Sequence, residues 1–236
     1  MRMILTATLA IAPMAMLPLM ANNNDSATRL HEAAAVFSEI MATPDKGIPE
    51  DLLERARCIV IVPQEKKVAF LVGAKYGKGY VSCRHHGGWS APGTVIVEGG
   101  SFGFQIGGSA TDIVMLVMNQ GGENKLLESK FTLGADAAIA AGPVGRTAAA
   151  ETDLQMHAEI LSWSRSQGLF AGVSLEGATL RQDEKDNAQM YGRELTNREI
   201  LTTAVRIPKM AAKLIGELDQ HPAGHMAAVA STGGSQ

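Results

Sequence analysis

The sequence predicts an α+β fold in which a curved antiparallel β-sheet, or a barrel-like core, is flanked by N-terminal and C-terminal helices. Three observations support this prediction. Apolar residues recur at helical spacing in residues 26–41. Short β-branched or aromatic runs, separated by turn signals about every ten positions, fill the middle of the chain. Helical patterns return after Arg181, so helices and strands are segregated rather than alternating.

The first 21 residues predict a signal peptide. Arg2 supplies a short positive region, and residues 4–20 form an uncharged apolar stretch interrupted by Pro13 and Pro18. We expect cleavage after Ala21, and therefore an exported protein that is periplasmic or secreted. An uncleaved N-terminal anchor is the alternative.

Two helices are expected before the strands. Ser26 can cap a helix that runs to about residue 41, with its apolar side against the sheet. A short helix is expected over residues 49–57, with proline at its first position and Glu50 and Asp51 in the first turn.

The strand region is rich in glycine, which inside a strand marks a bulge, a bend or a close backbone approach. This composition indicates a tightly curved sheet. One or two helical turns are expected within residues 121–127. The predicted strands are residues 58–62, 68–75, 80–85, 94–97, 102–106, 113–118, 131–133, 137–140, 156–162 and 169–175.

The C-terminal part predicts three helices and a tail. Residues 183–191 are polar and helical, Thr196 and Glu199 form a capping box, and residues 208–218 carry apolar residues on one side. Residues 220–236 are small and polar, which is typical of a disordered tail. We therefore expect one domain over residues 22–219.

Composition narrows the function classes. A net charge of −3 argues against non-specific binding of nucleic acid, which needs a basic surplus. Cys58 and Cys83 are too few for a disulfide framework and lie in apolar runs, so we expect buried thiols. A single disulfide, formed in an oxidising compartment, is the alternative.

A possible serine nucleophile is Ser101, in a G-x-S-x-G pattern at residues 99–103. A nucleophile elbow needs a strand before the serine and a helix after it. The residues that follow have strand spacing, and partners such as Asp112 or Asp136 with His157 have no supporting spacing. We therefore predict that the protein is not an enzyme.

Two cofactor patterns are also incomplete. Gly79 follows Lys78 where a phosphate-binding loop needs serine or threonine to hold magnesium. Strand alternation places Cys83 and His85 on one face and His86 on the other, which is too few ligands for a structural zinc. We expect no cofactor and no metal.

Several glycine-rich blocks resemble the SYLF domain family. They are Gly73–Gly79, Gly99–Gly107, Leu133–Gly145 and Ser166–Gly177, and they stand in the family's order. The resemblance covers roughly residues 26–205. It implies binding of phosphoinositide-type lipids and, by analogy with fungal members, of actin filaments. At Gln167 the family pattern has lysine, so the resemblance implies no anion contact at that position.

A local surplus of cations accompanies tyrosines around the first glycine block. Lys75, Tyr76, Lys78 and Tyr80 crowd an expected glycine turn, and Arg84 follows it. Tyrosine favours the membrane–water interface, and each lysine near anionic headgroups contributes about 1 kcal/mol to membrane binding. These five residues are the predicted lipid-binding site. An ordinary solvated hairpin tip is the alternative.

Together these features predict an exported, non-catalytic protein of the cell envelope, peripherally associated with a membrane. Its expected partner is an anionic phospholipid or phosphoinositide-like headgroup at the basic glycine turn. One alternative is a protein-interaction module, similar to the actin-binding members, with an envelope protein as partner. The other alternative is a serine hydrolase that uses Ser101.

Overall fold

The structure, a computed structural model, describes residues 23–43, 47–70, 72–85, 88–102, 107–144, 157–166 and 169–222. The expected signal peptide and nearly all of the expected tail lie outside these residues, so both stay predictions, as does the 22–219 domain boundary. Within the described ranges, none of the helices combines the length and apolar character needed to cross a membrane.

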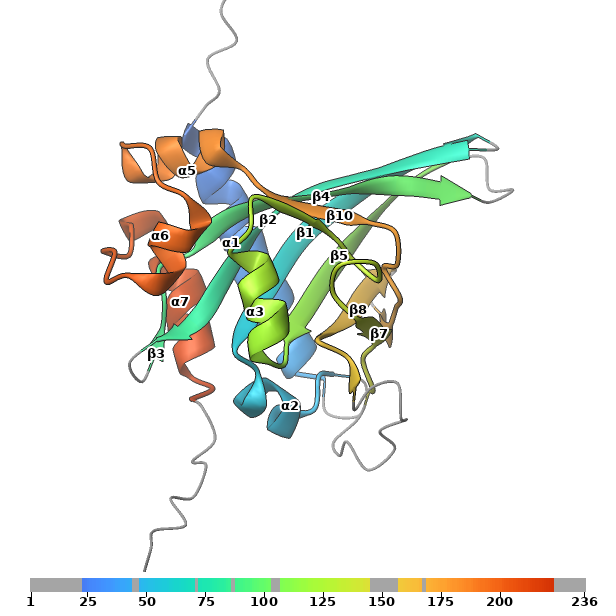
Figure 1. The fold of residues 1–236 in the computed structure, drawn as a ribbon, viewed down its shortest axis with the longest axis horizontal. Helices are drawn as coiled ribbons and strands as arrows, with labels where there is room; N and C mark the ends of the chain where they lie inside the picture. The colour runs from blue at the N-terminus through green and yellow to red at the C-terminus, as the bar shows by residue number, and fades with distance from the viewer. Residues whose placement is uncertain are drawn as a thin grey trace, which may run out of the picture.

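The predicted fold class is confirmed: helices from both ends of the chain flank a strongly curled sheet (Figure 1). The helical elements are α1 (Asn23–Met41), α2 (Glu50–Arg55), α3 (Gln120–Leu126), α5 (Glu184–Tyr191), α6 (Asn197–Thr202), the 3₁₀ turn η1 (Lys209–Ala211) and α7 (Ala212–Asp219). The strands are β1 (Cys58–Phe70), β2 (Val72–His85), β3 (Gly88–Trp89), β4 (Gly93–Phe102), β5 (Gly107–Val117), β6 (Lys130–Thr132), β7 (Ile139–Ala141), β8 (Ile160–Ser166), β9 (Leu169–Gly172) and β10 (Thr179–Gln182).

The ten described strands form one curled sheet with the order β6-β10-β4-β2-β1-β5-β8-β7, and β3 and β9 add to β2 and β8. All strand pairs are antiparallel except β7 with β8. The sheet is therefore mixed, whereas the sequence predicted a purely antiparallel one. Strands β6 and β7 are the first and last strands of this order, yet only a short segment of chain separates them. The sheet therefore curls toward closure as a half-barrel.

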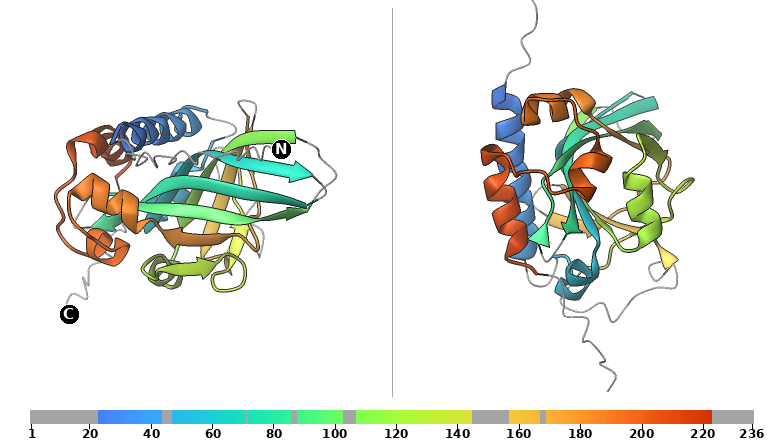
Figure 2. Two further views of the ribbon diagram at one scale, coloured as in Figure 1. Left: turned by 90° about the horizontal axis from the view of Figure 1, so that it is seen from above. Right: turned by 60° about the vertical axis from the view of Figure 1, so that its left-hand side comes forward.

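Four long strands extend beyond the curl as a projection that we call the tongue (Figures 1 and 2). It consists of residues 65–70 of β1, 72–76 of β2, 99–102 of β4 and 107–111 of β5. The β1–β2 hairpin lies inside, while β4 and β5 lie outside. Their neighbours β10 and β8 pair with them only up to Glu98 and Asp112. Within the described strands, the tongue is therefore paired internally and has two open edges.

A β-bulge in β1 marks the base of the tongue. Five residue steps on β1, from Ile61 to Lys66, face four steps on β2, from Tyr80 to Tyr76. The extra residue lies beside Pro63, and Gln64 takes a φ of 52°. A positive φ is uncommon for a residue with a side chain, and a bulge re-aims the side chains around it.

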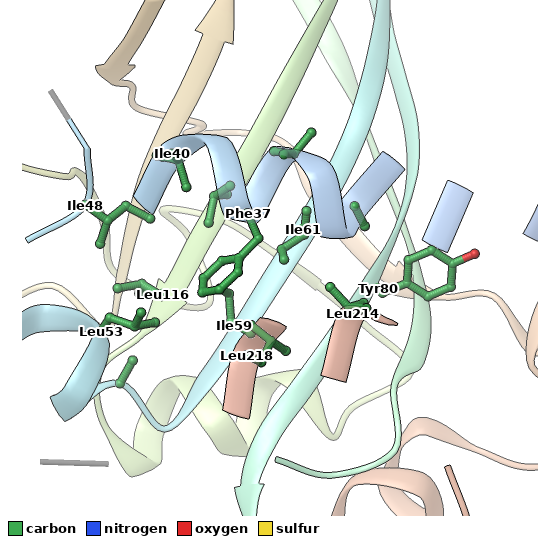
Figure 3. Packing of buried hydrophobic residues seen from close by; sticks show 14 of the residues in the cluster. Phe37, Ile40, Ile48, Leu53, Ile59, Ile61, Tyr80, Leu116, Leu214 and Leu218 are labelled. Carbon is green, nitrogen blue, oxygen red and sulfur yellow. The ribbon is translucent and has the colours of Figure 1, made fainter. Parts of the chain in front are cut away.

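Two hydrophobic clusters lie on opposite faces of the sheet. The inner cluster fills the curl with side chains such as Val60, Val97, Met115 and Phe131. The outer cluster lies between the sheet and the helices, which confirms the expected packing of α1 (Figure 3). Its labelled members in Figure 3 include Phe37 and Ile40 of α1, Ile59 and Ile61 of β1, and Leu214 and Leu218 of α7.

The expectation of two buried thiols is wrong. Cys58 and Cys83 lie directly opposite one another on β1 and β2 and form a disulfide. Both are buried in the inner cluster. The pairing follows from the register of the hairpin, which the spacing of the two cysteines does not reveal.

The C-terminal helices agree closely with expectation. Thr196 and Glu199 form the predicted capping box: the threonine hydroxyl accepts from the Glu199 N–H, and the Glu199 carboxylate accepts from the Thr196 N–H. The helix expected from residue 208 begins instead with the 3₁₀ turn η1. Strand β10 was not predicted, because its four residues form a strand only by pairing with β4 and β6.

Candidate functional site

The five predicted lipid-binding residues lie on strand β2, and the expected glycine turn is absent. The whole of Val72–His85 is strand and pairs with both β1 and β4. The glycines serve close packing instead: a Cβ at Gly79 would lie 2.2 Å from the Ile61 carbonyl oxygen, and one at Gly77 would lie 2.6 Å from Val62 Cγ1. They allow β2 to approach the bulged strand β1.

Strand alternation separates the predicted residues. Tyr76, Lys78, Tyr80 and Arg84 face the helices, whereas Lys75 faces the other side of the sheet. The structure therefore does not bring all five together on one surface. Each of them has a different environment.

Tyr80 is part of the outer core. Its side chain is 2% exposed, and its hydroxyl donates to the Ser26 carbonyl oxygen at 2.9 Å. Burial raises the pKa of the Tyr80 phenol to about 12. This hydroxyl joins β2 to the first turn of α1 and is not presented to a membrane surface.

Arg84 joins the ends of two helices to the sheet. Its guanidinium donates to the carbonyl oxygens of Leu53 at 3.1 Å, in α2, and of His221 at 3.0 Å, after α7. It also stacks over Trp89, 4.0 Å from the ring centroid. Burial lowers the Arg84 pKa, although the charges of Asp219 and Glu54 oppose this. A cation is stabilised at the carbonyl end of a helix, so the Arg84 guanidinium supports the fold in this position.

Lys78 lies in an ionic cluster between β2, α1 and α5. Its ammonium is 2.6 Å from Asp183 Oδ2 and 3.1 Å from Asp186 Oδ2, and Arg29 binds Asp186 at 2.9 Å. Burial alone would lower the pKa of Lys78. The hydrogen bonds and charges of the two aspartates outweigh this effect, so the pKa is raised from its ordinary value of 10.5. Two cations and two carboxylates balance one another here.

A groove beside this cluster brings two predicted residues, Tyr76 and Lys78, together. We call it the α1–β2 groove; its volume is about 230 Å³. Tyr76 is 44% exposed, and Lys66 lies directly opposite it on β1, so both side chains are on the same face. The lining residues are Arg29, Glu32, Pro63, Gln64, Lys66, Tyr76, Gly77 and Lys78.

The bulge residue Gln64 fixes one wall of the groove. Its backbone N–H donates to Asp112 Oδ1 at 2.9 Å, and its side-chain amide donates to Glu32 at 2.8 Å. Asp112 also accepts from Arg165 at 2.6 Å. Sequence reasoning missed Arg29, Glu32 and Gln64, although Pro63 inside a strand is a signal for a bulge.

The structure gives the serine-hydrolase alternative no support. Ser101 lies within β4, whose pairing with β2 continues to Phe102, so Ser101 itself stands in a paired strand and not on a strand-to-helix turn. Asp112 is engaged by Arg165 and Gln64. Of the metal-ligand types considered in the sequence, Cys83 is in a disulfide, and His86 lies outside the described residues.

Comparison with known proteins identifies relatives over most of the chain. Residues 98–221 match the family Ysc84, described as Las17-binding protein actin regulator. The match begins after Arg84, so it leaves the predicted lipid-binding residues outside. Because it covers more than half of the chain, it establishes the family.

Individual relatives extend the similarity toward the N-terminus. SH3 domain-containing YSC84-like protein 1 is 31% identical over 206 residues in Bos taurus, covering 86% of this chain and 60% of the relative. The Homo sapiens protein of the same name is 32% identical over 206 residues, with the same coverage. LAS seventeen-binding protein 3 of Saccharomyces cerevisiae is 34% identical over 179 residues, covering 74% of this chain and 39% of the relative. The chain thus spans 60% or less of the length of these relatives, and it belongs to the Ysc84 family, the SYLF domain family that the glycine-rich blocks resemble.

Proposed function

We propose that this protein is a non-catalytic protein-interaction module that contacts its partner through the α1–β2 groove and the adjoining tongue. The observation that carries this proposal is an exposed Tyr76 and Lys66 placed over a fixed ionic floor. Exposed tyrosines on a rigid support are typical of protein contact surfaces. The family description names binding of Las17 and regulation of actin, which are protein partners.

The rigidity of the floor matters for affinity. Arg29 and Lys78 are held by Asp183 and Asp186, so they need no reordering when a partner binds. Tyr76 has few torsions to lose and offers both a ring and a hydroxyl. The groove can therefore supply one aromatic anchor and a charged rim.

Site-specific photo-cross-linking tests this function directly. A benzophenone amino acid is placed at position 76 of the full chain, and a control chain carries it at exposed position 130 on β6. We expect a discrete cross-linked protein at position 76 and none at 130. Equal products at both positions, or none at either, would contradict the proposal.

Purified actin filaments provide a defined probe, because the family description includes actin regulation. We expect co-sedimentation that is weakened about tenfold by the double change Lys66→Glu and Tyr76→Ala. The matched control is Lys130→Glu. A cross-linked protein in the absence of actin binding would support a protein-interaction function with a partner other than actin.

Anionic lipid is the second candidate. The exposure of Tyr76 beside Lys66, with Lys75 on the opposite face of the tongue, favours it, because tyrosine and lysine both suit a lipid–water interface. Two lysines give only about 2 kcal/mol, which is reversible attachment. Flotation on anionic but not neutral vesicles, lost in Lys66→Glu/Lys75→Glu, would establish it. Flotation in the absence of any cross-linked protein would replace the first candidate.

We also propose that the protein is exported to the periplasm or secreted. The buried Cys58–Cys83 disulfide supports this, because disulfides persist in oxidising compartments and are rare in reducing ones. Fractionation of producing cells, with the redox state of the two cysteines measured by alkylation and intact mass, tests it. Reduced cysteines in a cytoplasmic fraction would contradict it.

A further inference from the structure

A second groove lies among the C-terminal helices. These helices are on the side of the molecule away from the tongue (Figures 1 and 2). It has a volume of about 370 Å³ and lies between the end of α5 and the segment Val205–Lys209, which connects α6 to η1. We call it the C-terminal groove. None of the predicted lipid-binding residues lines it.

The charge of this region is opposite to that of the whole chain. Residues 193–213 contain five basic and two acidic residues, whereas the whole chain has a net charge of −3. Arg193, Arg206 and Lys209 line the groove and are exposed. The pKa of Glu199 is lowered, first by hydrogen bonds from Thr196 and then by the charge of Arg193, so Arg193 lies near that carboxylate. Arg206 and Lys209 form no ion pair with any described residue, so they are available to an anion.

The groove also has an apolar contact point. Ile207 is 38% exposed, whereas Val205, two residues earlier, packs toward the small cluster of Ala91, Leu195 and Ile200. Tyr191 supplies part of the floor, and its hydroxyl donates to the Pro92 carbonyl oxygen at 2.7 Å. An apolar side chain therefore has a fixed surface on which to pack, between cations.

The backbone of the connecting segment is open. Between Ala204 and Ile207, the described backbone hydrogen bonds include only one, from the Val205 N–H to the Thr203 carbonyl at 2.8 Å. The remaining N–H and C=O groups of this non-helical segment face no backbone partner among the described residues. An incoming peptide provides both donors and acceptors for them, whereas a lipid phosphate provides acceptors only.

From these observations we propose that the C-terminal groove binds a short acidic peptide with a central apolar residue. The apolar side chain packs on Ile207, carboxylates pair with Arg206 and Lys209, and the peptide backbone aligns with residues 204–207. The class of partner rests on the proposed protein-interaction function, but the surface is separate from the α1–β2 groove. The protein therefore has two contact surfaces, one presenting an aromatic residue and one basic.

Fluorescence anisotropy of labelled nine-residue peptides tests the proposal on the full chain. The probe peptide carries leucine or phenylalanine at its centre and aspartate or glutamate on both sides, and the comparison peptides carry serine or lysine in the acidic positions. We expect saturable binding of the acidic peptides alone, weakened about tenfold by Arg206→Glu/Lys209→Glu and less by Ile207→Ser. Binding should also weaken as salt rises from 0.1 to about 0.5 M, because exposed charges are screened.

The matched control is Lys66→Glu/Lys75→Glu, which changes the net charge equally but in the tongue, with Lys66 in the α1–β2 groove and Lys75 on the opposite face. It should bind the acidic peptide like the wild type and lose the cross-linked or actin-bound partner described above. Thermal unfolding of every variant confirms that it is folded. If the wild type does not bind the acidic peptide, or if the Arg206/Lys209 variant binds it equally well, the proposal is overturned. Neither result affects the function proposed for the α1–β2 groove. Anionic vesicles that bind through Arg206 and Lys209 when peptides do not would assign the groove to lipid and overturn it as well.

Discussion

The two halves of strand β2 have similar residues and opposite roles. The inner half, from Lys78 to Arg84, and the tongue half, from Val72 to Tyr76, both contain glycine, lysine and tyrosine. In the inner half, Lys78, Tyr80 and Arg84 each hold a partner on α1, α2, α5 or after α7. In the tongue half, Tyr76 remains at the surface.

Residue type alone therefore does not mark a binding residue in this protein. Helix α1 covers the outer face of β2 at Tyr80, which is part of the outer cluster (Figure 3), but leaves Tyr76 exposed. The same phenol is therefore a structural contact at one position and a potential ligand contact four residues away. Substitutions in the inner half should change stability, and substitutions in the tongue half should change binding.

The largest effect is expected at the covalent link of the inner half. Replacing Cys58 and Cys83 by alanine removes a cross-link between residues 25 apart in sequence, which should lower the free energy of unfolding by about 3 kcal/mol. Urea unfolding of the variant and of the wild type measures it. Reductant should shift the wild-type midpoint in the same direction, and identical midpoints with and without reductant would show that the link contributes nothing.

Arg84→Ala should come next. It leaves the carbonyl ends of two helices without their cation and removes the contact with Trp89, so we expect a loss of about 2–3 kcal/mol. Arg84→Lys should recover only part of this, because lysine has no planar fork. The comparison would fail if Lys75→Ala, in the tongue half, cost as much.

Alkaline pH should lower the free energy of unfolding through Tyr80 of the inner half. The folded state holds the Tyr80 proton more tightly than the unfolded chain, so the stabilisation is fully present below pH 10 and is lost as pH rises toward 12. The slope due to this one residue is at most about 1.4 kcal/mol per pH unit. The raised pKa values of Tyr191 and Lys78 act in the same direction.

Urea midpoints of the wild type and Tyr80→Phe between pH 8 and 11.5 provide the test. At pH 8 the variant should be less stable by about 1 kcal/mol, because it lacks the hydrogen bond to Ser26. Above pH 10 its stability should fall less steeply than that of the wild type. Parallel curves over the whole range would show that Tyr80 titrates alike in both states.

The smallest effect on stability belongs to the tongue half. Lys75→Ala and Tyr76→Ala should each change the free energy of unfolding by less than about 0.5 kcal/mol, because Tyr76 lies outside the core and Lys75 is only half-buried. Thermal unfolding and the cross-linking yield are measured on the same samples. A Tyr76→Ala variant that melts early would mean that its ring supports the fold, and the contrast between the halves would disappear.

Much of the architecture followed from local patterns. The apolar period of residues 26–41 predicted α1 and its buried side, and Thr196 with Glu199 predicted the start of α6. These features depend on neighbouring residues only, which is why they can be read from one sequence. Strand β10 could not be, because its pairing partners β4 and β6 lie about 50 to 85 residues away.

The candidate site was only partly predictable. Tyr76 and Lys78 both line the α1–β2 groove, but the expected turn is absent, because Gly77 and Gly79 serve close packing on β1. The groove partners Arg29 and Gln64 were missed, since they become neighbours of β2 only through the packing of α1 and the bulge in β1.

Local sequence patterns were sufficient to predict the class of fold, the helices at both ends and the family. Only the tertiary structure decided which cations and tyrosines are held inside the molecule, that the two cysteines pair, and that Arg206 and Lys209 face an open groove. The physical reason is the range of the interactions. Periodicity and capping act within a few residues, whereas ion pairs, strand register and burial depend on segments that meet only after the chain has folded.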